Sequence, residues 1–531
     1  MKIKRALISV SDKTGLVPLA RALARRKVEI LSTGGTAKLL RNQGIRVTEI
    51  AKFTGFPEIL SGRVKTLHPK VHGGILADRG DREHLRQAKK LGLKPIDLVV
   101  VNLYPFEASA RRLPAACLPD RQGQAGKNAP FAGLIEQIDI GGVALIRSAA
   151  KNFRSVGVVS RPSQYSDVMK ELERNGGNLS EPFRFRLAVE AFAESSYYDA
   201  VIHQTLAHRF PKKLPWAEKI VLAASKRQQL RYGENPHQSS VWYSWAQTGG
   251  PPGGLGGARQ LHGKELSFNN LLDLDAVLRV TAAFRKPCAA VVKHSNPCGV
   301  ACGGTLSQAF QRAFEGDPLS AFGGIVGLNR PVDAAAARAI AASGFLECIV
   351  APGYRAQALQ ILRAKKNLRI IEVPEKQLRE CLDLKQISGG LLAQQPDEFK
   401  RGPARWKLAT KTRPTAAQKK DLLFAWTVAR FVRSNAIVIA KGEQAVGIGM
   451  GLTSRVDSVA FALKKAGRRA RGSVLASDGF FPKPDGPALA VKAGVKAIVQ
   501  PGGSIQDPEV IRVAQKARIP MLLTGERHFL H

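Results

Sequence analysis

The first part of the chain alternates between short apolar segments and amphipathic ones. Strand-like runs cover residues 6–10, 28–31 and 98–103, and a helical pattern covers residues 16–26. Alternation of this kind builds a mostly parallel sheet that is covered by helices. We therefore predict an α/β fold for this part of the chain.

Polar turns follow three of these strands, at residues 11–15, 32–36 and 102–105. Ligands bind beyond the carboxyl ends of strands in open α/β sheets, so we expect the three turns to share one pocket. Residues 32–36 offer hydroxyls and backbone amides just before a helical segment, an arrangement that can hold a phosphate. An ordinary capped turn is the alternative.

The length of 531 residues predicts two to four compact units. A helical pattern over residues 184–208 is followed by Pro211 and Pro215, so a domain boundary is expected near residue 210. Strand patterns return at residues 289–292, 349–351 and 436–440, with a helix over residues 416–433. The glycine- and proline-rich stretch 249–257 is expected to form an exposed loop.

Several classes of protein are disfavoured by simple features of the sequence. No apolar run approaches the roughly 18 to 20 residues that a membrane span requires. The N-terminus lacks the apolar core of a signal peptide. Six scattered cysteines are too few for a disulfide framework. We expect a cytoplasmic protein with reduced thiols.

Charge suggests an anionic partner. Lys and Arg number 81 against 42 Asp and Glu, which gives a net charge of +39. The tightest basic group, residues 464–471, is spaced like the exposed side of a helix, and no nucleic-acid-binding motif accompanies it. A nucleic-acid-binding protein is nevertheless the alternative function that the charge suggests.

Two further motifs in the N-terminal part carry candidate chemistry. Residues 62–74 gather Arg63, Lys65, Thr66 and two histidines between glycines, and a basic surface turn is the alternative. Asp139 precedes a helical segment that contains Lys151. Because Lys151 follows a short apolar run, we expect it to be desolvated and thus suited to proton transfer.

In the C-terminal part, Lys293 and His294 follow a strand-like run, a location suited to acid–base catalysis, although a structural histidine is the alternative. Cys298 and Cys302 suggest a zinc deaminase, which uses Pro-Cys-x-x-Cys together with His-x-Glu. Here the spacing is Cys-x-x-x-Cys, and none of the ten histidines is followed two residues later by glutamate. We therefore expect no zinc site.

Over residues 1–205 the motifs and their order resemble the inosine monophosphate (IMP) cyclohydrolase domain of the bifunctional purine-biosynthesis enzymes, which has a methylglyoxal-synthase-like fold. The resemblance implies that the nucleotide and its phosphate contact Ser11, Lys13, Ser32, Thr33, Gly34, Gly35, Thr36, Arg63, Lys65 and Thr66. It implies that the reacting carboxamide is surrounded by Asn102, Tyr104, Asp139, Ile140 and Gly141, with Lys151 as proton donor and acceptor. Residues 107–137 depart from the family pattern and are expected to be a surface insertion.

Over residues 210–531 the chain resembles the 5-aminoimidazole-4-carboxamide ribonucleotide (AICAR) formyltransferase domain of the same enzymes, which has a cytidine-deaminase-like fold without the zinc. The segments that carry the resemblance are 230–238, 293–299, 317–324, 433–436, 477–482, 500–504 and 527–529. It implies a nucleotide site with Arg231, Tyr232, Gly323, Glu347, Arg455, Phe480 and Arg527, and a folate site with Asp485, Ser504 and Ile505. It implies that His294 accepts a proton from the attacking amine, while Lys293 and Asn435 stabilise the tetrahedral intermediate.

The family resemblance further implies a cytoplasmic homodimer with formyltransferase sites across the subunit interface. Such an enzyme formylates AICAR with 10-formyltetrahydrofolate and cyclises formyl-AICAR to IMP, without a metal. Neither a membrane nor a nucleic acid is an expected partner. An enzyme that retains only one of the two activities is a further alternative.

Overall fold

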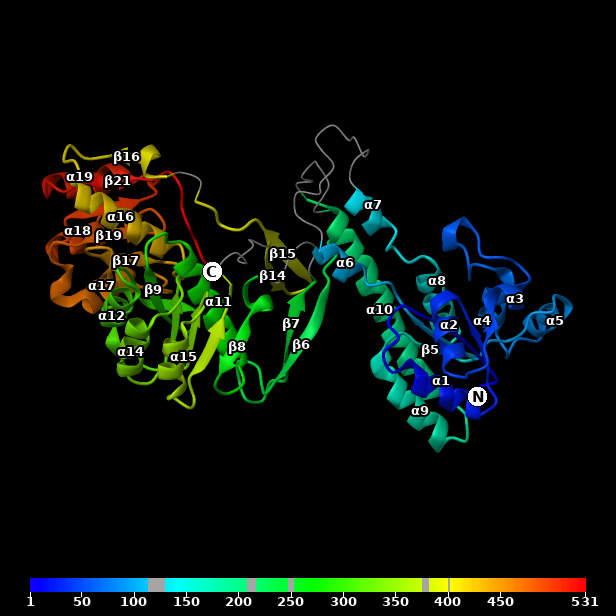
Figure 1. Cartoon of the computed structure of the whole chain (residues 1–531). Helices are drawn as coiled ribbons and strands as arrows, with labels where there is room; N and C mark the ends of the chain where they lie inside the picture. Colours follow the sequence, from blue (N-terminus) through cyan, green and yellow to red (C-terminus); the bar gives the residue numbers. More distant parts are fainter. Residues whose placement is uncertain (113–128, 208–215, 247–252, 375–381, 400–401) are drawn as a thin grey trace. The chain divides into compact units, whose positions relative to one another are not determined.

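The computed structural model describes residues 1–112, 129–207, 216–246, 253–374, 382–399 and 402–531 (Figure 1). The chain forms two compact units. Unit 1 comprises Met1–Ser225 and Ser244–Pro251, and unit 2 comprises Lys226–Tyr243 and Pro252–His531. The boundary expected near residue 210 lies outside the described residues.

Unit 1 is built on a five-stranded parallel sheet in the order β3-β2-β1-β4-β5. Its strands are β1 (Arg5–Val10), β2 (Glu29–Ser32), β3 (Thr48–Glu49), β4 (Leu98–Asn102) and β5 (Gly157–Val159). The predicted α/β fold is thus confirmed, and the strands predicted at residues 6–10, 28–31 and 98–103 correspond to β1, β2 and β4. The strand order reverses between β1 and β4, which is where open α/β sheets bind their ligands.

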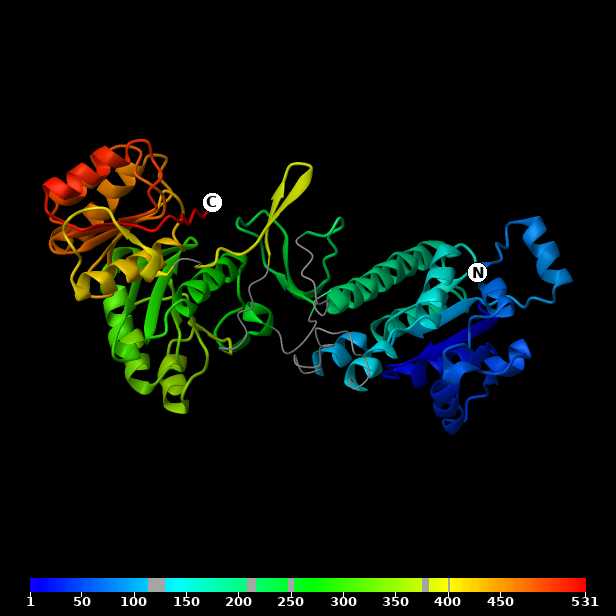
Figure 2. The same cartoon turned by 90° about the horizontal axis from the view of Figure 1, so that it is seen from above.

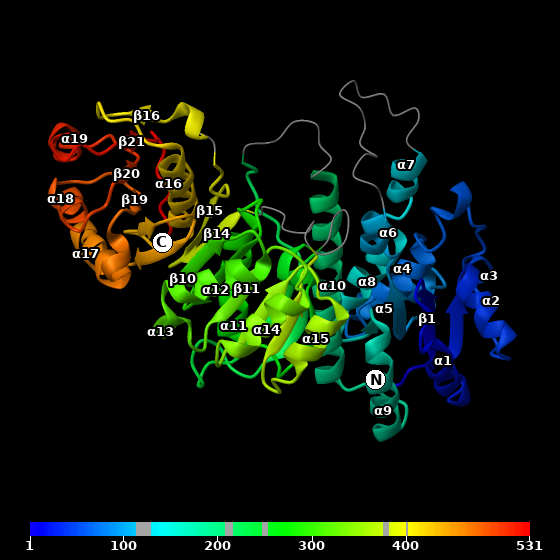
Figure 3. The ribbon, with the colours of Figure 1, turned by 60° about the vertical axis from the view of Figure 1, so that its left-hand side comes forward.

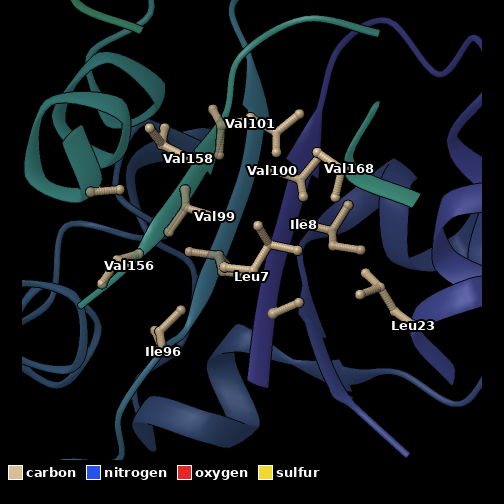
Figure 4. Close-up of a cluster of buried hydrophobic side chains, with 14 of the residues drawn as sticks. Leu7, Ile8, Leu23, Ile96, Val99, Val100, Val101, Val156, Val158 and Val168 are labelled. Carbon is tan, nitrogen blue, oxygen red and sulfur yellow. The ribbon is translucent and has the colours of Figure 1, made fainter. Parts of the chain in front are cut away.

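Apolar side chains fill the space between this sheet and its helices. Successive strand residues point to opposite faces, so Ile8 gathers with Leu23 and Val168 on one side of β1, while Leu7 points to the other (Figure 4). The helices of unit 1 are α1 (Leu16–Arg25), α2 (Gly34–Asn42), α3 (Ile50–Thr54), α4 (Pro69–Leu76), α5 (Arg82–Lys90), α6 (Phe106–Arg112), α7 (Ala129–Ile135), α8 (Gly141–Lys151), α9 (Tyr165–Arg174) and α10 (Glu181–Ala207).

The expectation of a surface insertion over residues 107–137 is wrong at its two ends. Ala110 of α6 and Leu134 of α7 are buried in one apolar cluster with Tyr198 and Val201 of α10. The apolar faces of these short helices therefore need a partner, which α10 supplies. Residues 113–128 lie outside the described part of the chain.

Unit 2 contains two six-stranded mixed sheets, in the orders β10-β9-β11-β12-β13-β8 and β16-β21-β20-β19-β17-β18. The first consists of β8 (Arg259–His262), β9 (Cys288–Lys293), β10 (Asn296–Cys302), β11 (Ile325–Leu328), β12 (Cys348–Ala351) and β13 (Arg369–Glu372). The second consists of β16 (Lys407–Leu408), β17 (Ile437–Ala440), β18 (Ala445–Gly449), β19 (Val474–Ser477), β20 (Ala497–Gln500) and β21 (Met521–Leu523). The predicted strands at 289–292, 349–351 and 436–440 are confirmed.

Both faces of these sheets are buried, because alternate strand residues belong to different cores. In β9, Ala290 and Val292 join a core shared by the two sheets, α11 (Phe268–Ala282) and α16 (Ala416–Ala429). Val291 joins a second core, under α12 (Leu306–Gly316), α14 (Ala334–Ala342) and α15 (Ala356–Arg363). These three helices are labelled in Figure 3. The remaining helices of unit 2 are α13 (Pro318–Ala321), α17 (Arg455–Ala466), α18 (Asp485–Lys492) and α19 (Asp507–Lys516).

Two separate hairpins complete the strands of the described chain. One pairs β6 (Ala224–Leu230) with β7 (Ser240–Trp245), and the other, yellow in Figure 2, pairs β14 (Asp383–Ile387) with β15 (Gly390–Gln394). The exposed loop expected at 249–257 is wrong in its described part, because Gly254–Gly257 form a half-buried 3-10 turn. Among the described helices, none combines the length and apolar character that a membrane span requires.

Candidate functional site

The three polar turns of unit 1 lie together at the carboxyl ends of β1, β2 and β4, as predicted. The side-chain oxygen of Asn102 accepts the backbone N–H groups of Ser11 (2.7 Å) and Asp12 (2.9 Å). Its amide nitrogen donates to the carbonyl of Asp12 (2.8 Å), and the hydroxyls of Ser9 and Thr33 are 3.0 Å apart. Asn102 thus fixes the first turn, and its polar atoms are already bonded to backbone.

Two hydroxyl side chains of the second turn point toward the sheet. Ser32 is buried and donates to the carbonyl of Ile8 (2.6 Å), and the Thr36 hydroxyl bonds the N–H (3.2 Å) and carbonyl (3.0 Å) of Val10. The outward surface is backbone, because a Cβ added to Gly34 or Gly35 would meet no atom within 4 Å. An anion can therefore approach the N-terminus of α2 closely, where N–H groups without helical partners attract negative charge.

The three cations that the resemblance assigns to the phosphate have exposed or weakly held side chains. Lys13 is exposed, Lys65 lies 2.9 Å from a carboxylate oxygen of Glu58, and Arg63 is paired with Glu136. Solvent-exposed ion pairs of this kind contribute little to stability. All three cations can thus exchange their present contacts for a phosphate at small cost.

Asp139 lies at the N-terminus of α8 beside the third turn. Burial raises the pKa of Asp139, and hydrogen bonds from the backbone N–H groups of Gly142 and Tyr104 oppose that rise. The Gly142 N–H bond is 2.6 Å long, and a Cβ added to Gly142 would lie 2.5 Å from the other carboxylate oxygen. Next to it, a Cβ at Gly141 would lie 3.0 Å from the Thr66 hydroxyl. A carboxylate with a raised pKa is a stronger proton acceptor.

Asp139 and Ile140 also line a hollow of about 510 Å³ in unit 1. Its other lining residues are His72, Ile138, Val143, Ala144, Arg147, Ser148, Asp199 and Ile202. The Nδ1 atom of His72 lies 3.0 Å from the Ser148 hydroxyl, its Nε2 atom is buried without a partner in the described chain, and burial lowers the pKa of His72. In the sequence, His72 is evident only as part of a basic motif, and its contact with Ser148 could not be predicted because Ser148 lies in a different helix.

Lys151 lies at the opposite end of α8 from Asp139. The helix runs from Gly141 to Lys151, which at 1.5 Å per residue is roughly 15 Å along the axis. Lys151 is exposed, so its expected desolvation is wrong; the preceding apolar residues Ala149 and Ala150 face the core instead. Within one chain the structure does not bring Lys151 to Asp139.

In unit 2, four residues that were predicted from separate motifs line one hollow of about 440 Å³: Asn435, Arg455, Phe480 and Asp485. Their positions are before β17, at the start of α17, after β19 and at the start of α18. The other lining residues are Thr453, Ser454, Val456, Pro482, Lys483 and Phe529. The guanidinium of Arg527 lies 4.7 Å from the ring centroid of Phe529 and so adjoins this hollow.

A buried network holds Arg455 at this hollow. Its guanidinium donates to Asp478 (2.5 Å), to the Ser477 hydroxyl (2.8 Å) and to the side-chain oxygen of Asn435 (2.7 Å). Arg455 is 7% exposed and Asp478 is fully buried. The amide nitrogen of Asn435 donates to the carbonyls of Leu452 (2.9 Å) and Thr453 (3.3 Å). To stabilise a tetrahedral intermediate as predicted, Asn435 must release one of these carbonyls.

His294 and Ser295 form the two-residue turn between β9 and β10, with φ values of 53° and 59°. Both residues lie in the left-handed region, which non-glycine residues enter at a cost. Asp273 of α11 accepts the backbone N–H groups of His294 (3.2 Å) and Ser295 (2.6 Å) and thereby fixes the turn. The exposed imidazole of His294 is therefore presented from a constrained backbone.

Lys293 and His294 do not line the 440 Å³ hollow. The Lys293 ammonium donates to the carbonyl of Phe322 (3.0 Å). Asn296 nevertheless connects this turn to the hollow, because its side-chain oxygen accepts the N–H of Arg433 (3.1 Å), two residues before Asn435. Lys293 and His294 are thus linked through Asn296 to the segment that contains Asn435, but the three predicted catalytic residues do not line one hollow.

Besides Arg527, which only adjoins the hollow, six further predicted residues of unit 2 lie outside its lining: Arg231, Tyr232, Gly323, Glu347, Ser504 and Ile505. Glu347 is held by the buried Arg369 at 2.6 Å. Ile505 is 98% exposed in the loop between β20 and α19.

Cys298 and Cys302 face opposite sides of their sheet. An irregularity in β10 between Pro297 and Gly299 shifts the alternation, so Cys302 joins the core shared by the two sheets while Cys298 packs under α12. Burial raises the pKa of the Cys298 thiol to about 12. The described cysteines, at 288, 298, 302 and 348, are free thiols as predicted, whereas Cys117 and Cys381 lie outside the described residues. No group of three or more His, Cys, Asp or Glu side chains in the described chain could hold a metal ion.

Comparison with known families matches two models to this chain. The model of the AICARFT/IMPCHase bienzyme matches residues 149–465, and that of the MGS-like domain matches residues 15–144. The predicted methylglyoxal-synthase-like N-terminal part is thereby confirmed.

Curated relatives match the chain over almost its full length. The bifunctional purine biosynthesis protein PurH is 47% identical in Cyanothece sp. and 45% identical in Nostoc punctiforme, each over 528 residues. The protein of the same name in Rippkaea orientalis is 47% identical over 532 residues. Each alignment covers 99% of both chains. The crystal structure of ForH is 40% identical over 38% of this chain and 98% of its own, with a TM-score of 0.32, which is too low to support a structural argument.

Proposed function

The chain belongs to the AICARFT/IMPCHase bienzyme family, and from this premise we propose that unit 1 closes the purine ring while unit 2 transfers the formyl group. The protein is an AICAR formyltransferase and IMP cyclohydrolase of purine biosynthesis, with 10-formyltetrahydrofolate as the formyl donor. The observation that carries the proposal for unit 2 is the 440 Å³ hollow, which gathers four predicted residues from separate parts of the sequence.

For ring closure, the turns after β1, β2 and β4 hold the nucleotide. Its phosphate lies at the N-terminus of α2, near Lys13, Arg63 and Lys65. Ring closure requires the carboxamide nitrogen to attack the formyl carbon and then requires loss of water. Asp139 supports the first step, because its raised pKa favours acceptance of the nitrogen's proton. Holding the carboxamide and the formyl group near attack geometry lowers the barrier further, by at most about 7 to 11 kcal/mol for well-oriented intramolecular partners.

The assignment of Lys151 as proton donor and acceptor stays a prediction from the family resemblance. Lys151 occupies the same face of α8 as Ala144 of the 510 Å³ hollow, since seven residues are almost two helical turns. It lies one turn beyond Arg147, toward the end of that hollow. Tyr104, which is 43% exposed, is proposed to stabilise the developing oxyanion.

For formyl transfer, Arg455, Phe480 and Arg527 bind the nucleotide at the hollow of unit 2. The exocyclic amine attacks the formyl carbon, His294 accepts its proton, and Lys293 and Asn435 stabilise the tetrahedral intermediate. Breakdown of the intermediate releases the folate nitrogen with a proton. Asp485 lines the same hollow, and the exposed loop with Ser504 and Ile505 is proposed to meet the folate.

A cytoplasmic homodimer with formyltransferase sites across its interface is part of this proposal. It is supported by the distribution of candidates in unit 2, because Arg231 and Tyr232 do not line the hollow that contains Asn435. Two defective variants, Arg231→Ala and Asn435→Ala, test it after the chains are mixed under conditions that allow subunit exchange. If sites are shared, about a quarter of the formyltransferase activity returns, because half of the dimers are hybrids with one intact site. Sites built within single chains predict no recovery.

The proposed function is tested with the purified chain, AICAR and 10-formyltetrahydrofolate. Consumption of the formyl donor and formation of IMP are followed separately, and both are expected at the same steady-state rate. Accumulation of formyl-AICAR without IMP would support an enzyme with only the first activity. Absence of both reactions, together with salt-sensitive nucleic-acid binding that AICAR does not displace, would support the nucleic-acid alternative.

A further inference from the structure

His528 is a buried imidazole outside the groups assigned above. It is 1% exposed, and its Nδ1 atom lies 2.8 and 2.9 Å from the two carboxylate oxygens of Asp397. A carboxylate only accepts, so Nδ1 donates. The ring stacks on Phe399, with centroids 6.1 Å apart, and lies 5.1 Å from the ring of Trp426.

The second ring nitrogen of His528 shows that this residue is more than a packing element. Its Nε2 atom is buried without a partner in the described chain. An unsatisfied buried polar atom is destabilising, and an apolar side chain of similar size would avoid this cost. The hydrogen bond from Nδ1 to Asp397 is therefore the contact that distinguishes histidine from leucine here.

The segment 527–531 carries two residues of the candidate site on either side of His528. Phe529 lines the 440 Å³ hollow and Arg527 stacks on Phe529; both are exposed, whereas His528 between them is buried. The N–H of His528 donates to the carbonyl of Asp478 (3.1 Å), the residue whose carboxylate holds Arg455. When His528 is held in place, Phe529 in the wall of the hollow is therefore held relative to Arg455.

We propose that His528 is a positioning residue for formyl transfer, and that its bond to Asp397 holds Arg527 and Phe529 at the hollow. This inference rests on the proposed function, which assigns Arg527 to the nucleotide. Asp397 and His528 are 131 positions apart in the chain, so their bond connects the segment after β15 to the segment after β21. Loss of the bond frees the 527–531 segment and weakens nucleotide binding more than it slows the chemical step.

The test uses full-length variants, each assayed for both activities. We expect His528→Ala and Asp397→Ala to raise the KM for AICAR in formyl transfer about tenfold with kcat changed less than about threefold. The Asp397 side chain is 47% exposed. We therefore expect Asp397→Ala to fold even if His528→Ala does not. Asp397→Asn retains an acceptor for Nδ1 and is expected to restore a KM within about threefold of wild type.

Two further variants make the result decisive. Glu398→Ala, an exposed acidic residue next to Asp397, is the matched control and is expected to leave both reactions unchanged. Ring closure in every variant reports on the integrity of the chain. If Arg527→Ala raises the KM but the Asp397 variants do not, the positioning role is wrong while the proposed function stands. If Arg527→Ala leaves the KM unchanged, the assignment of Arg527 fails, and the positioning role fails with it.

Discussion

Asn102 in unit 1 and Asn435 in unit 2 hold the backbone around their respective sites. The amide of Asn102 bonds the turn after β1, and the amide of Asn435 bonds the carbonyls before α17. Each side chain thus positions the neighbouring backbone groups, whatever contact it makes with substrate. Single residues of these sites act through such supporting bonds as much as through direct contact.

The burial of His72 predicts that the stability of unit 1 depends on pH. Burial lowers the pKa of His72 below its ordinary value of about 6.5, so the unfolded chain binds a proton at a higher pH than the folded chain does. The folded state of unit 1 therefore gains stability from neutral His72 above about pH 6.5, and this stability is lost as the pH falls. We expect His72→Gln, which can still bond Ser148, to lose less stability of unit 1 than wild type between about pH 7.5 and 5.5.

Hydrogen exchange of peptides from α4 and α8 at both pH values measures this difference, because it reports on unit 1 alone. His203→Gln, at an exposed position of α10 in the same unit, is the control and should keep the wild-type pH dependence. Identical pH dependence in wild type and His72→Gln would contradict the role given to burial.

Among the elements, the N-terminus of α8 depends on one glycine. Alanine usually stabilises a helix relative to glycine by about 1 kcal/mol. At Gly142, however, the added Cβ would lie 2.5 Å from the Asp139 carboxylate. We expect Gly142→Ala to reduce kcat for ring closure by about 10- to 100-fold, because Asp139 must move, and to leave formyl transfer unchanged.

Gly133→Ala in α7 is the matched control, since a Cβ there meets no atom within 4 Å. Steady-state assays of both activities with purified variants check the prediction. Full ring-closure activity in Gly142→Ala would show that Asp139 need not occupy its observed position.

The turn between β9 and β10 gives a corresponding prediction for unit 2. Asp273 accepts both N–H groups of this strained turn. Asp273→Ala is expected to reduce kcat for formyl transfer about tenfold and to leave ring closure intact, because the imidazole of His294 is then less well oriented. The control is Asp275→Ala on the same helix, whose carboxylate pairs with the exposed Arg279. Equal effects of the two substitutions would rule out a specific role for the Asp273 clamp.

Elements that follow from local periodicity could be predicted, whereas contacts between distant segments could not. The strands at residues 6–10 and 289–292 were evident because both are short apolar runs next to polar turns. No local pattern indicates that β10 changes its alternation at Pro297 and so separates Cys298 from Cys302. Similarly, Asp397 and His528 are 131 positions apart, and only the folded chain shows that they are paired. The predicted desolvation of Lys151 was wrong for a related reason, because a helix that contains an apolar run buries only one of its faces.

For the whole molecule, the net charge of +39 exceeds what two anionic substrates require. A charge of this size attracts anions over long distances when the salt concentration is low. Added salt screens this attraction, and the Debye length is about 10 Å at 0.1 M. We expect kcat/KM for AICAR to fall at least about threefold between roughly 0.05 and 0.5 M salt, with kcat changed much less. Stopped-flow or steady-state measurements across this range check it. A kcat/KM that is independent of salt would mean that the excess charge does not assist substrate capture.

The division of two reactions between two units is the central claim, and it is tested most directly by two substitutions at exposed residues. Lys151→Ala and His294→Asn are each made in the full chain, and both activities are measured in each protein. Both side chains are exposed, and asparagine tolerates the left-handed backbone of residue 294, so neither change should disturb folding. We expect Lys151→Ala to lose ring closure by at least about 100-fold and keep formyl transfer, and His294→Asn to do the reverse. Loss of both activities in either folded variant, or of neither in both, would contradict the account.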